Sequence, residues 1–214
     1  MRRNDKVAFM AGAYVFPGGR VDDDDYLRAR DLAAAWTITC RFPDLTAEME
    51  LPYRVAAVRE MQEEAAVTVA LDDLIPIAHW VTPEVETRRY DTRFFLARMP
   101  DNQVARHDDG ETTELVWLTP ELALEQSRTS QIMLPPPTWT TVKRLASHRS
   151  VDQALAWARA TTIVRVQPGF IRDGDRTILT LPGDPLHPPL PGWDVPEDTR
   201  FVLEEGKGWK PVPA

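Results

Sequence analysis

The sequence has little of what defines several other classes of protein. It contains one cysteine, Cys40, so an intrachain disulfide framework is excluded and a reducing cytoplasm is favoured. Its four histidines are scattered, without the spacing of a zinc site. No apolar run approaches the ~18 residues that a membrane span needs, and no signal peptide is visible. We therefore expect a cytoplasmic protein that has no membrane partner.

Positive charge is also in short supply. The 214 residues include 25 lysines and arginines against 33 aspartates and glutamates, which gives a net charge of −8. A general nucleic-acid binder usually presents a basic surface, so this composition argues against nucleic acid as a partner. Negative charge is instead concentrated, above all in the segment Arg59-Glu60-Met61-Gln62-Glu63-Glu64.

This acidic segment lies in a stretch with helical character. Pro52 suits the first position of a helix and compact apolar residues continue to about Ala66, so we expect a helix between them. Glu60, Glu63 and Glu64 then lie at i, i+3 and i+4, on one face. Their like charges repel one another, and Mg²⁺ or Mn²⁺, which prefer carboxylate oxygens, would relieve the repulsion. An exposed acidic helix face without any ligand is the alternative.

A second motif lies far upstream. An apolar run leads into a Pro-Gly-Gly turn in Tyr14-Val15-Phe16-Pro17-Gly18-Gly19-Arg20-Val21-Asp22, where glycine lets the backbone bend sharply and approach a ligand. Together, F-P-G-G and R-E-x-x-E-E resemble the Nudix box, G-x5-E-x7-R-E-U-x-E-E-x-G-U, in which U is aliphatic. The combination is far more specific than either half, and the chain resembles the Nudix hydrolases.

The resemblance implies a metal site. Glu60, Glu63 and Glu64 are expected to hold Mg²⁺ or Mn²⁺ over a diphosphate, with the carbonyl of Gly19, or that of Gly18, facing the metal. Arg59 is expected to orient a box glutamate, and Glu63, at i+4, is within its reach. The metal reverses the local charge, polarises phosphoryl oxygens and activates a water that attacks phosphorus.

Two further groups are candidates for the reaction. The water is assisted by a box carboxylate or by a more distant acid, for which Glu111 and Glu114 are candidates; two surface glutamates are an equally good interpretation. Arg88 and Arg89 are candidate substrate contacts, because guanidinium groups pair well with phosphate. Pairing with a nearby aspartate such as Asp91 is the alternative for these arginines.

The match departs from the box at three points. The glutamate of G-x5-E is Asp25, a shorter carboxylate that could have lost its function. The spacer from Asp25 to Arg59 is 33 residues instead of 7; such an insertion costs little as loop entropy and could cover the pocket or build a dimer contact. The late glycine is Ala66, which should weaken the helix stop. These departures leave open a catalytically degenerate Nudix-fold module that binds or senses a nucleotide.

A second block refines the resemblance. The run Trp80-Val81-Thr82-Pro83 is followed by Thr87-Arg88-Arg89-Tyr90-Asp91-Thr92-Arg93-Phe94-Phe95-Leu96. A similar block and a long insertion occur in the coenzyme A diphosphatase-like branch of the family. The resemblance implies a nucleoside diphosphate linked to another moiety as substrate, with coenzyme A or acyl-coenzyme A favoured. The upstream motif of some coenzyme A-cleaving Nudix enzymes is not recognisable, so the substrate stays open.

The remaining patterns complete the expected fold. We expect an α+β protein with the Nudix fold, an α/β/α sandwich with a mixed sheet. The domain covers 1–160 with an insertion at about 26–51, and an extension over 161–214 packs on the domain or on a partner subunit of a homodimer. Further helices are expected over 26–41, 120–127, 138–148 and 151–160, and strands ending at residue 17 and over 74–81, 92–98, 114–118, 163–166 and 177–181.

Overall fold

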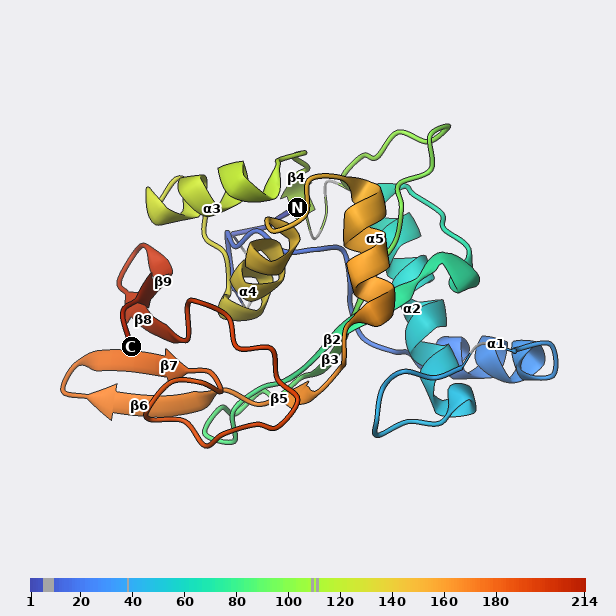
Figure 1. The fold of residues 1–214 in the computed structure, drawn as a ribbon. Helices are drawn as coiled ribbons and strands as arrows, with labels where there is room; N and C mark the ends of the chain where they lie inside the picture. Colours follow the sequence, from blue (N-terminus) through green and yellow to red (C-terminus); the bar gives the residue numbers. More distant parts are fainter. Residues whose placement is uncertain (6–9, 38, 109, 111) are drawn as a thin grey trace.

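A mixed sheet of three strands lies at the centre of the protein, in the order β3-β2-β5 (Figure 1). The computed structural model describes residues 1–5, 10–37, 39–108, 110 and 112–214. β2 (Ile75–Val81) pairs antiparallel with β3 (Asp91–Leu96) and parallel with β5 (Arg165–Val166). Every residue of β2 is buried, so both faces of this strand are covered.

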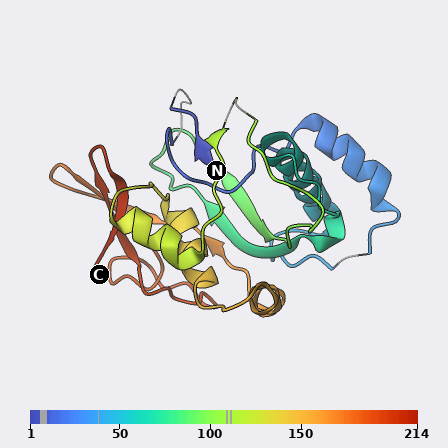
Figure 2. The same cartoon turned by 90° about the horizontal axis from the view of Figure 1, so that it is seen from above.

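Helices cover the two faces. α1 (Asp23–Ala33) and α2 (Ala47–Ala65) lie on one side of β2 and β3, and α4 (Pro136–Leu145) and α5 (Val151–Ala160) lie on the other (Figure 2). Alternation along β3 divides the core accordingly, because Phe95 packs on the cluster that Met61 of α2 also contacts, whereas Phe94 packs on the cluster of Trp139 and Leu155. This arrangement is the predicted α/β/α sandwich. Within the described ranges, no helix has the length and apolar character of a membrane span.

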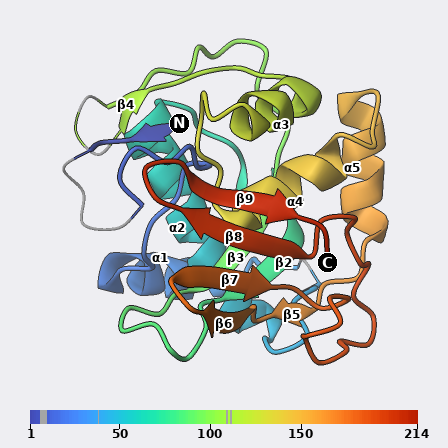
Figure 3. The ribbon, with the colours of Figure 1, turned by 90° about the vertical axis from the view of Figure 1, so that its left-hand side faces the viewer.

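The chain after α5 forms a second sheet of four antiparallel strands (Figure 3). They are β6 (Gly169–Asp173), β7 (Arg176–Thr180), β8 (Arg200–Glu204) and β9 (Gly208–Val212). Leu179 and Phe201 join the core cluster that contains Leu124 of α3 (Pro120–Arg128) and Trp139. The strands β8 and β9 were not expected from the sequence. Pro211 weakens the strand signal of its stretch in the sequence. The structure tolerates this proline because β9 is the last strand of its sheet.

The segment before the glycine bend has less regular structure than predicted. β1 (Arg2–Arg3) pairs with β4 (Thr112–Glu114), and the strand expected to end at residue 17 is reduced to isolated bridges at Ala13 and Tyr14. The amide of Tyr14 donates to the carbonyl of Met133 at 2.8 Å. Residues 6–9 of this expected segment lie outside the described residues. The strand expected over 114–118 ends where it was expected to begin.

The boundaries of the helices correct the predictions in part. α2 begins at Ala47 and not at Pro52, because the hydroxyl of Thr46 caps it by accepting a hydrogen bond from the amide of Met49. α1 ends at Ala33, well before the expected residue 41, and a 3₁₀ turn, η1 (Leu71–Asp73), follows α2. α3 and α5 begin at the expected residues, Pro120 and Val151, where the hydroxyls of Thr119 and Ser150 cap them.

Candidate active site

The glycine bend and the acidic turn of α2 meet in space. The amide of Gly18 donates a hydrogen bond to Glu64 Oε2 at 2.9 Å. A Cβ atom at Gly19 would lie 2.2 Å from Glu60 Oε1, so only glycine allows this close approach. Glu60 and Glu64 lie one turn apart on α2, and both turn their carboxylates toward the bend. Two motifs that are far apart in sequence therefore form one site.

Arg59 organises the acidic side chains around it. Its Nη1 lies 2.7 Å from Glu60 Oε1 and 2.9 Å from Glu63 Oε2, which is the predicted i+4 pair. Its Nη2 also donates to the carbonyl of Arg20, on the bend. The hydrogen bonds that Arg59 donates to Asp25, first, and then to Glu60 raise the pKa of Arg59 above its ordinary value. Arg59 therefore fixes the α2 carboxylates relative to the bend.

Asp25 keeps a contact with Arg59 despite its shorter side chain. It is 2% exposed and accepts hydrogen bonds from Arg59 Nε at 3.1 Å and Nη2 at 2.9 Å. Asp25 lies in the first turn of α1, and its carboxylate also accepts from the amide of Asp22 in a capping box. The departure from glutamate at this position does not disconnect the residue from the site.

The carboxylates fit a divalent cation. Arg59 is a single guanidinium and it faces Asp22, Asp25, Glu60 and Glu63, so most of their negative charge is not offset by it. Hard oxygen ligands of this kind suit Mg²⁺ or Mn²⁺. The three box glutamates differ in exposure: the side chain of Glu63 is 59% exposed, that of Glu60 is 13% exposed, and Glu64 is buried. Glu60 and Glu64 therefore have the stronger claim as ligands.

Glu114, the candidate distant acid, lies near this site. Burial lowers the pKa of the Met1 ammonium, and the negative charges of Glu64 and Glu114 act in the opposite direction, so both carboxylates lie within electrostatic range of one group. Glu114 Oε2 accepts a hydrogen bond from the Tyr14 hydroxyl at 2.6 Å. Glu111, the other candidate, lies outside the described residues.

Arg88 and Arg89 lie in the connection between β2 and β3, and both are exposed. Arg89 Nε donates to the carbonyl of Thr82 at 3.2 Å, which ties the arginine to the other side of this connection. Asp91 forms its ion pair with Arg93, a residue that the sequence analysis did not single out. The role of Arg88 and Arg89 as substrate contacts stays a prediction.

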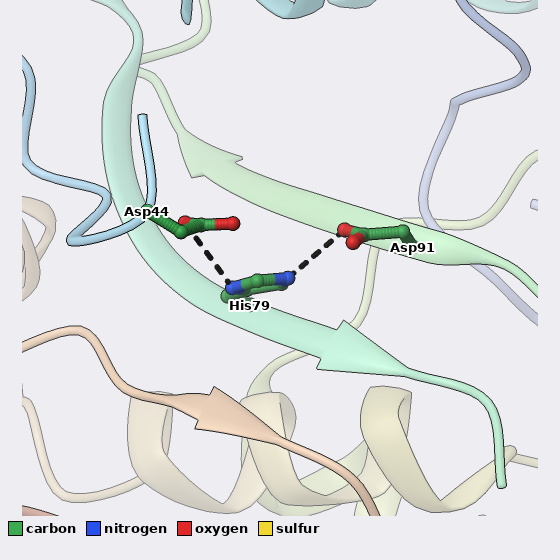
Figure 4. Close-up of side chains that lie close together, drawn as sticks. All are labelled: Asp44, His79 and Asp91. Carbon is green, nitrogen blue, oxygen red and sulfur yellow. Dashed lines mark hydrogen bonds and ion pairs between the residues drawn. The ribbon is translucent and has the colours of Figure 1, made fainter. Parts of the chain in front are cut away.

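A second polar cluster, around His79, was not predicted from the sequence (Figure 4). His79 of β2 is completely buried between Asp44, in the insertion, and Asp91, at the start of β3. Arg93 forms ion pairs with both aspartates. Burial and then the charge of Arg93 lower the pKa of His79. The register of β2 and β3 brings His79 beside Arg93, and the insertion adds Asp44 to them.

Known proteins of one family are similar to this chain. The family model described as NUDIX domain matches residues 1–135. Acyl-coenzyme A diphosphatase NUDT19 of Xenopus laevis is 23% identical, over 89% of this chain and 71% of that protein. Putative nudix hydrolase 7 of Caenorhabditis elegans is also 23% identical, over 87% of this chain and 68% of that protein. The human NUDT19 protein is 29% identical over 60% of this chain and 37% of its own length.

A solved structure supports the same conclusion at the level of the fold. The crystal structure of a NUDIX hydrolase from Alicyclobacillus acidocaldarius superposes with a TM-score of 0.61, at 21% identity, over 72% of this chain and 85% of that chain. The family model covers both motifs of the candidate site, from the glycine bend to the acidic turn of α2. The chain therefore belongs to the Nudix family of diphosphate-bond hydrolases, as its two-part motif predicted.

Proposed function

We propose that this protein is a divalent-metal-dependent pyrophosphohydrolase that cleaves a nucleoside diphosphate linked to another moiety. The observation that carries the proposal is the meeting of Glu60 and Glu64 with the Gly18–Gly19 bend. Carboxylates that converge on a bend with room for no side chain give a site where a cation and a diphosphate can approach the backbone closely.

The residues at the bend have distinct roles in this proposal. Glu60, Glu64 and the carbonyl of Gly19 would hold Mg²⁺ or Mn²⁺, with Glu63 as a further, more exposed ligand. When bound, the metal supplies positive charge to the phosphoryl oxygens and lowers the pKa of a water. Arg59, gripped by Asp25, holds Glu60 and Glu63 in place and limits their mutual repulsion.

Glu114 is our candidate for the base that accepts a proton from the attacking water. One of its oxygens accepts a hydrogen bond from Tyr14, which fixes the orientation of the carboxylate. Its second oxygen would then accept the proton from water. A base must lie within hydrogen-bond reach of its proton when substrate is bound, and a carboxylate held from behind by Tyr14 is positioned for this task.

Coenzyme A or acyl-coenzyme A is the substrate that we favour. Two observations support it: the W-x-T-P and R-R-Y-D-T-x-F-F block, and the names of two of the similar proteins, which are acyl-coenzyme A diphosphatases. Arg88 and Arg89 are exposed and can reach a phosphate that lies away from the scissile bond. Hydrolysis adds water across the P–O–P bond and would leave one phosphate of the diphosphate on each product.

The rival interpretation is a module that binds a nucleotide without turnover. It was motivated by Asp25 and Ala66, where the chain departs from the motif. Asp25 nevertheless grips Arg59, and Ala66 takes the left-handed conformation expected of the motif glycine, with φ 55° and ψ 30°. Neither departure removes the contact or the backbone conformation that the motif requires, so the enzyme is the better supported of the two interpretations.

The test is a panel of coenzyme A, acyl-coenzyme A and other nucleoside diphosphate conjugates, each with Mg²⁺ or Mn²⁺. We expect Glu64→Gln to lower kcat by about 100-fold or more, because the loss of a metal-binding charge removes several kcal/mol of transition-state stabilisation. Glu48→Gln, an exposed glutamate on the same helix, is the matched control and should retain activity.

A second variant tests the bend independently of charge. Gly19→Ala would place its Cβ against Glu60 and should weaken metal binding while the helix stays folded. Equal turnover by the wild type and Glu64→Gln would overturn the assignment of Glu64. Nucleotide binding without metal and without turnover in the wild type would favour the binding module.

A further inference from the structure

The cluster around His79 has no part in the proposed reaction. His79 lies in the central strand β2 and is 0% exposed, while the side chains of Asp44 and Asp91 on either side of it are 39% and 49% exposed (Figure 4). Arg93 lies between the rings of Phe42 and Tyr53, with its guanidinium 5.3 Å and 5.2 Å from their centres. Residues from the insertion, the sheet and α2 thus enclose one imidazole.

The two nitrogens of His79 differ in what they contact. Nε2 lies 2.9 Å from Asp91 Oδ1, a normal hydrogen bond in which the ring donates. Nδ1 is buried and has no hydrogen-bond partner among the described residues. It lies 3.7 Å from Asp44 Oδ1, which is too long for a hydrogen bond. With the proton on Nε2, a lone pair on Nδ1 faces a carboxylate oxygen, and a cation between them would bind both.

Other residues hold both atoms that border the gap between His79 Nδ1 and Asp44 Oδ1. Asp91 fixes the tautomer and the orientation of His79, as carboxylates commonly do for metal-binding histidines. Arg93 Nη2 lies 2.6 Å from Asp44 Oδ2, which leaves Asp44 Oδ1 directed at the ring. Arg93 offsets one of the two carboxylate charges, so with a neutral imidazole the cluster keeps a net negative charge. The geometry of the two ligand atoms therefore favours a cation in the gap, and the net negative charge of the cluster partly offsets the burial and the positive charge of Arg93.

We propose that His79 Nδ1 and Asp44 Oδ1 bind a divalent transition-metal ion of the Zn²⁺ or Co²⁺ class, with water as the remaining ligands. Bonds of about 2.0–2.2 Å to each atom span the 3.7 Å separation at an open angle. An imidazole nitrogen favours such ions over Mg²⁺, which prefers oxygen alone. Asp91 supports the ligand and does not bind the ion, because it lies on the opposite ring nitrogen. The ion would join the insertion to the central sheet.

The experiment uses the full chain with Glu64→Gln, so that the binding of metal ions at the candidate active site is weakened. Calorimetry with Zn²⁺, the visible spectrum with Co²⁺, and the melting temperature with and without Zn²⁺ are compared with those of the same protein carrying Asp44→Asn. Asp152→Asn is the matched control, because Asp152 is also an exposed aspartate paired with an arginine, Arg98. We expect Asp44→Asn to weaken Zn²⁺ at least tenfold, and Asp91→Asn to weaken it by about 10–100-fold.

Three results would overturn this site. The first is the absence of Zn²⁺ and Co²⁺ binding in the Glu64→Gln protein. The second is equal Zn²⁺ affinity for the Asp44→Asn and Asp152→Asn variants, which would place the ion elsewhere. The third is stabilisation by mild acid, lost in Asp44→Asn, without any response to Zn²⁺, which would mean that a proton fills the gap. None of these results bears on the hydrolysis of a diphosphate, so the two proposals fail independently.

Discussion

The Asp25 carboxylate accepts two hydrogen bonds from the Arg59 guanidinium, although 33 residues separate the two positions. We predict that Asp25→Asn lowers the free energy of unfolding by about 1.5–3 kcal/mol, because a buried, charge-assisted pair is lost. Activity should fall too, since Arg59 would no longer hold Glu60 and Glu63 in place. Denaturant unfolding and kcat/KM measure the two effects.

Asp24→Asn is the control for this prediction, because Asp24 lies in the same turn of α1 and is exposed. The control should match the wild type within about 0.5 kcal/mol. If Asp25→Asn behaved like the control in both assays, the contact would contribute neither to stability nor to the geometry of the site.

Glu50 and Arg54 form a buried ion pair one turn apart near the start of α2. Each is 1% exposed; Arg54 Nε donates to Glu50 Oε1 at 2.6 Å, and its Nη1 donates to the carbonyls of Leu71 and Leu74. We predict that Glu50→Ala destabilises the protein by about 3–5 kcal/mol, because Arg54 keeps a buried charge without its counterion.

Thermal and denaturant unfolding check this value, with Glu48→Ala as the control in the same helix. Glu48 is exposed, so its truncation should cost little. A loss in Glu50→Ala no larger than in Glu48→Ala would mean that water or a rearranged Arg54 compensates for the missing carboxylate.

The sequence was most informative where the signal is local or belongs to a family motif. The start of α5 at Val151 was predicted correctly, because a serine cap such as Ser150, which accepts from the amide of Gln153, needs only neighbouring residues. The glycine bend and the acidic helix were predicted to form one site, because the two motifs together resemble the Nudix box. The start of α2 was wrong because Pro52 and Thr46 give competing signals, and the cap at Thr46 prevailed.

What the sequence could not predict depends on contacts between distant segments. His79 looked like one of four scattered histidines, because its neighbours Asp44 and Asp91 are placed by the insertion and by the register of β2 and β3. The contact of Asp25 with Arg59 depends likewise on how α1 packs on α2. The domain boundary at residue 160, the homodimer and the cytoplasmic location stay predictions.

Ala66 is strained in the position where the motif has glycine. Its φ of 55° and ψ of 30° lie in the left-handed region, which costs a residue with a Cβ roughly 1–2 kcal/mol. We predict that Ala66→Gly raises the free energy of unfolding by about 1 kcal/mol, since part of that gain is offset by the greater freedom of glycine in the unfolded chain.

The control is Ala70→Gly, because Ala70 is also exposed but has an ordinary φ of −72°. Glycine should destabilise the protein there, so the two substitutions should shift the melting temperature in opposite directions. Shifts of the same sign would show that the conformation of Ala66 is not what limits the end of α2.

Tyr14 gives a pH-dependent measure of the site near Glu114. Burial, and then the hydrogen bond to Glu114, raise the pKa of Tyr14 from 10.0 to about 12. Because the pKa is higher in the folded than in the unfolded state, the stabilisation is complete below pH 10 and is lost as the pH rises toward 12. Glu114→Gln should lower the pKa of Tyr14, since a neutral acceptor no longer opposes the tyrosinate, but burial should keep it above 10.

A spectroscopic titration of tyrosinate follows this group, with Tyr14→Phe as the reference for the other three tyrosines. The difference between the wild type and Tyr14→Phe isolates Tyr14, and the same difference in the Glu114→Gln background isolates the effect of the carboxylate. If the two difference curves coincided, Glu114 would not contact Tyr14 in solution. The argument that Tyr14 holds Glu114 ready as a base would then lose its physical basis, because nothing else described here fixes the orientation of that carboxylate.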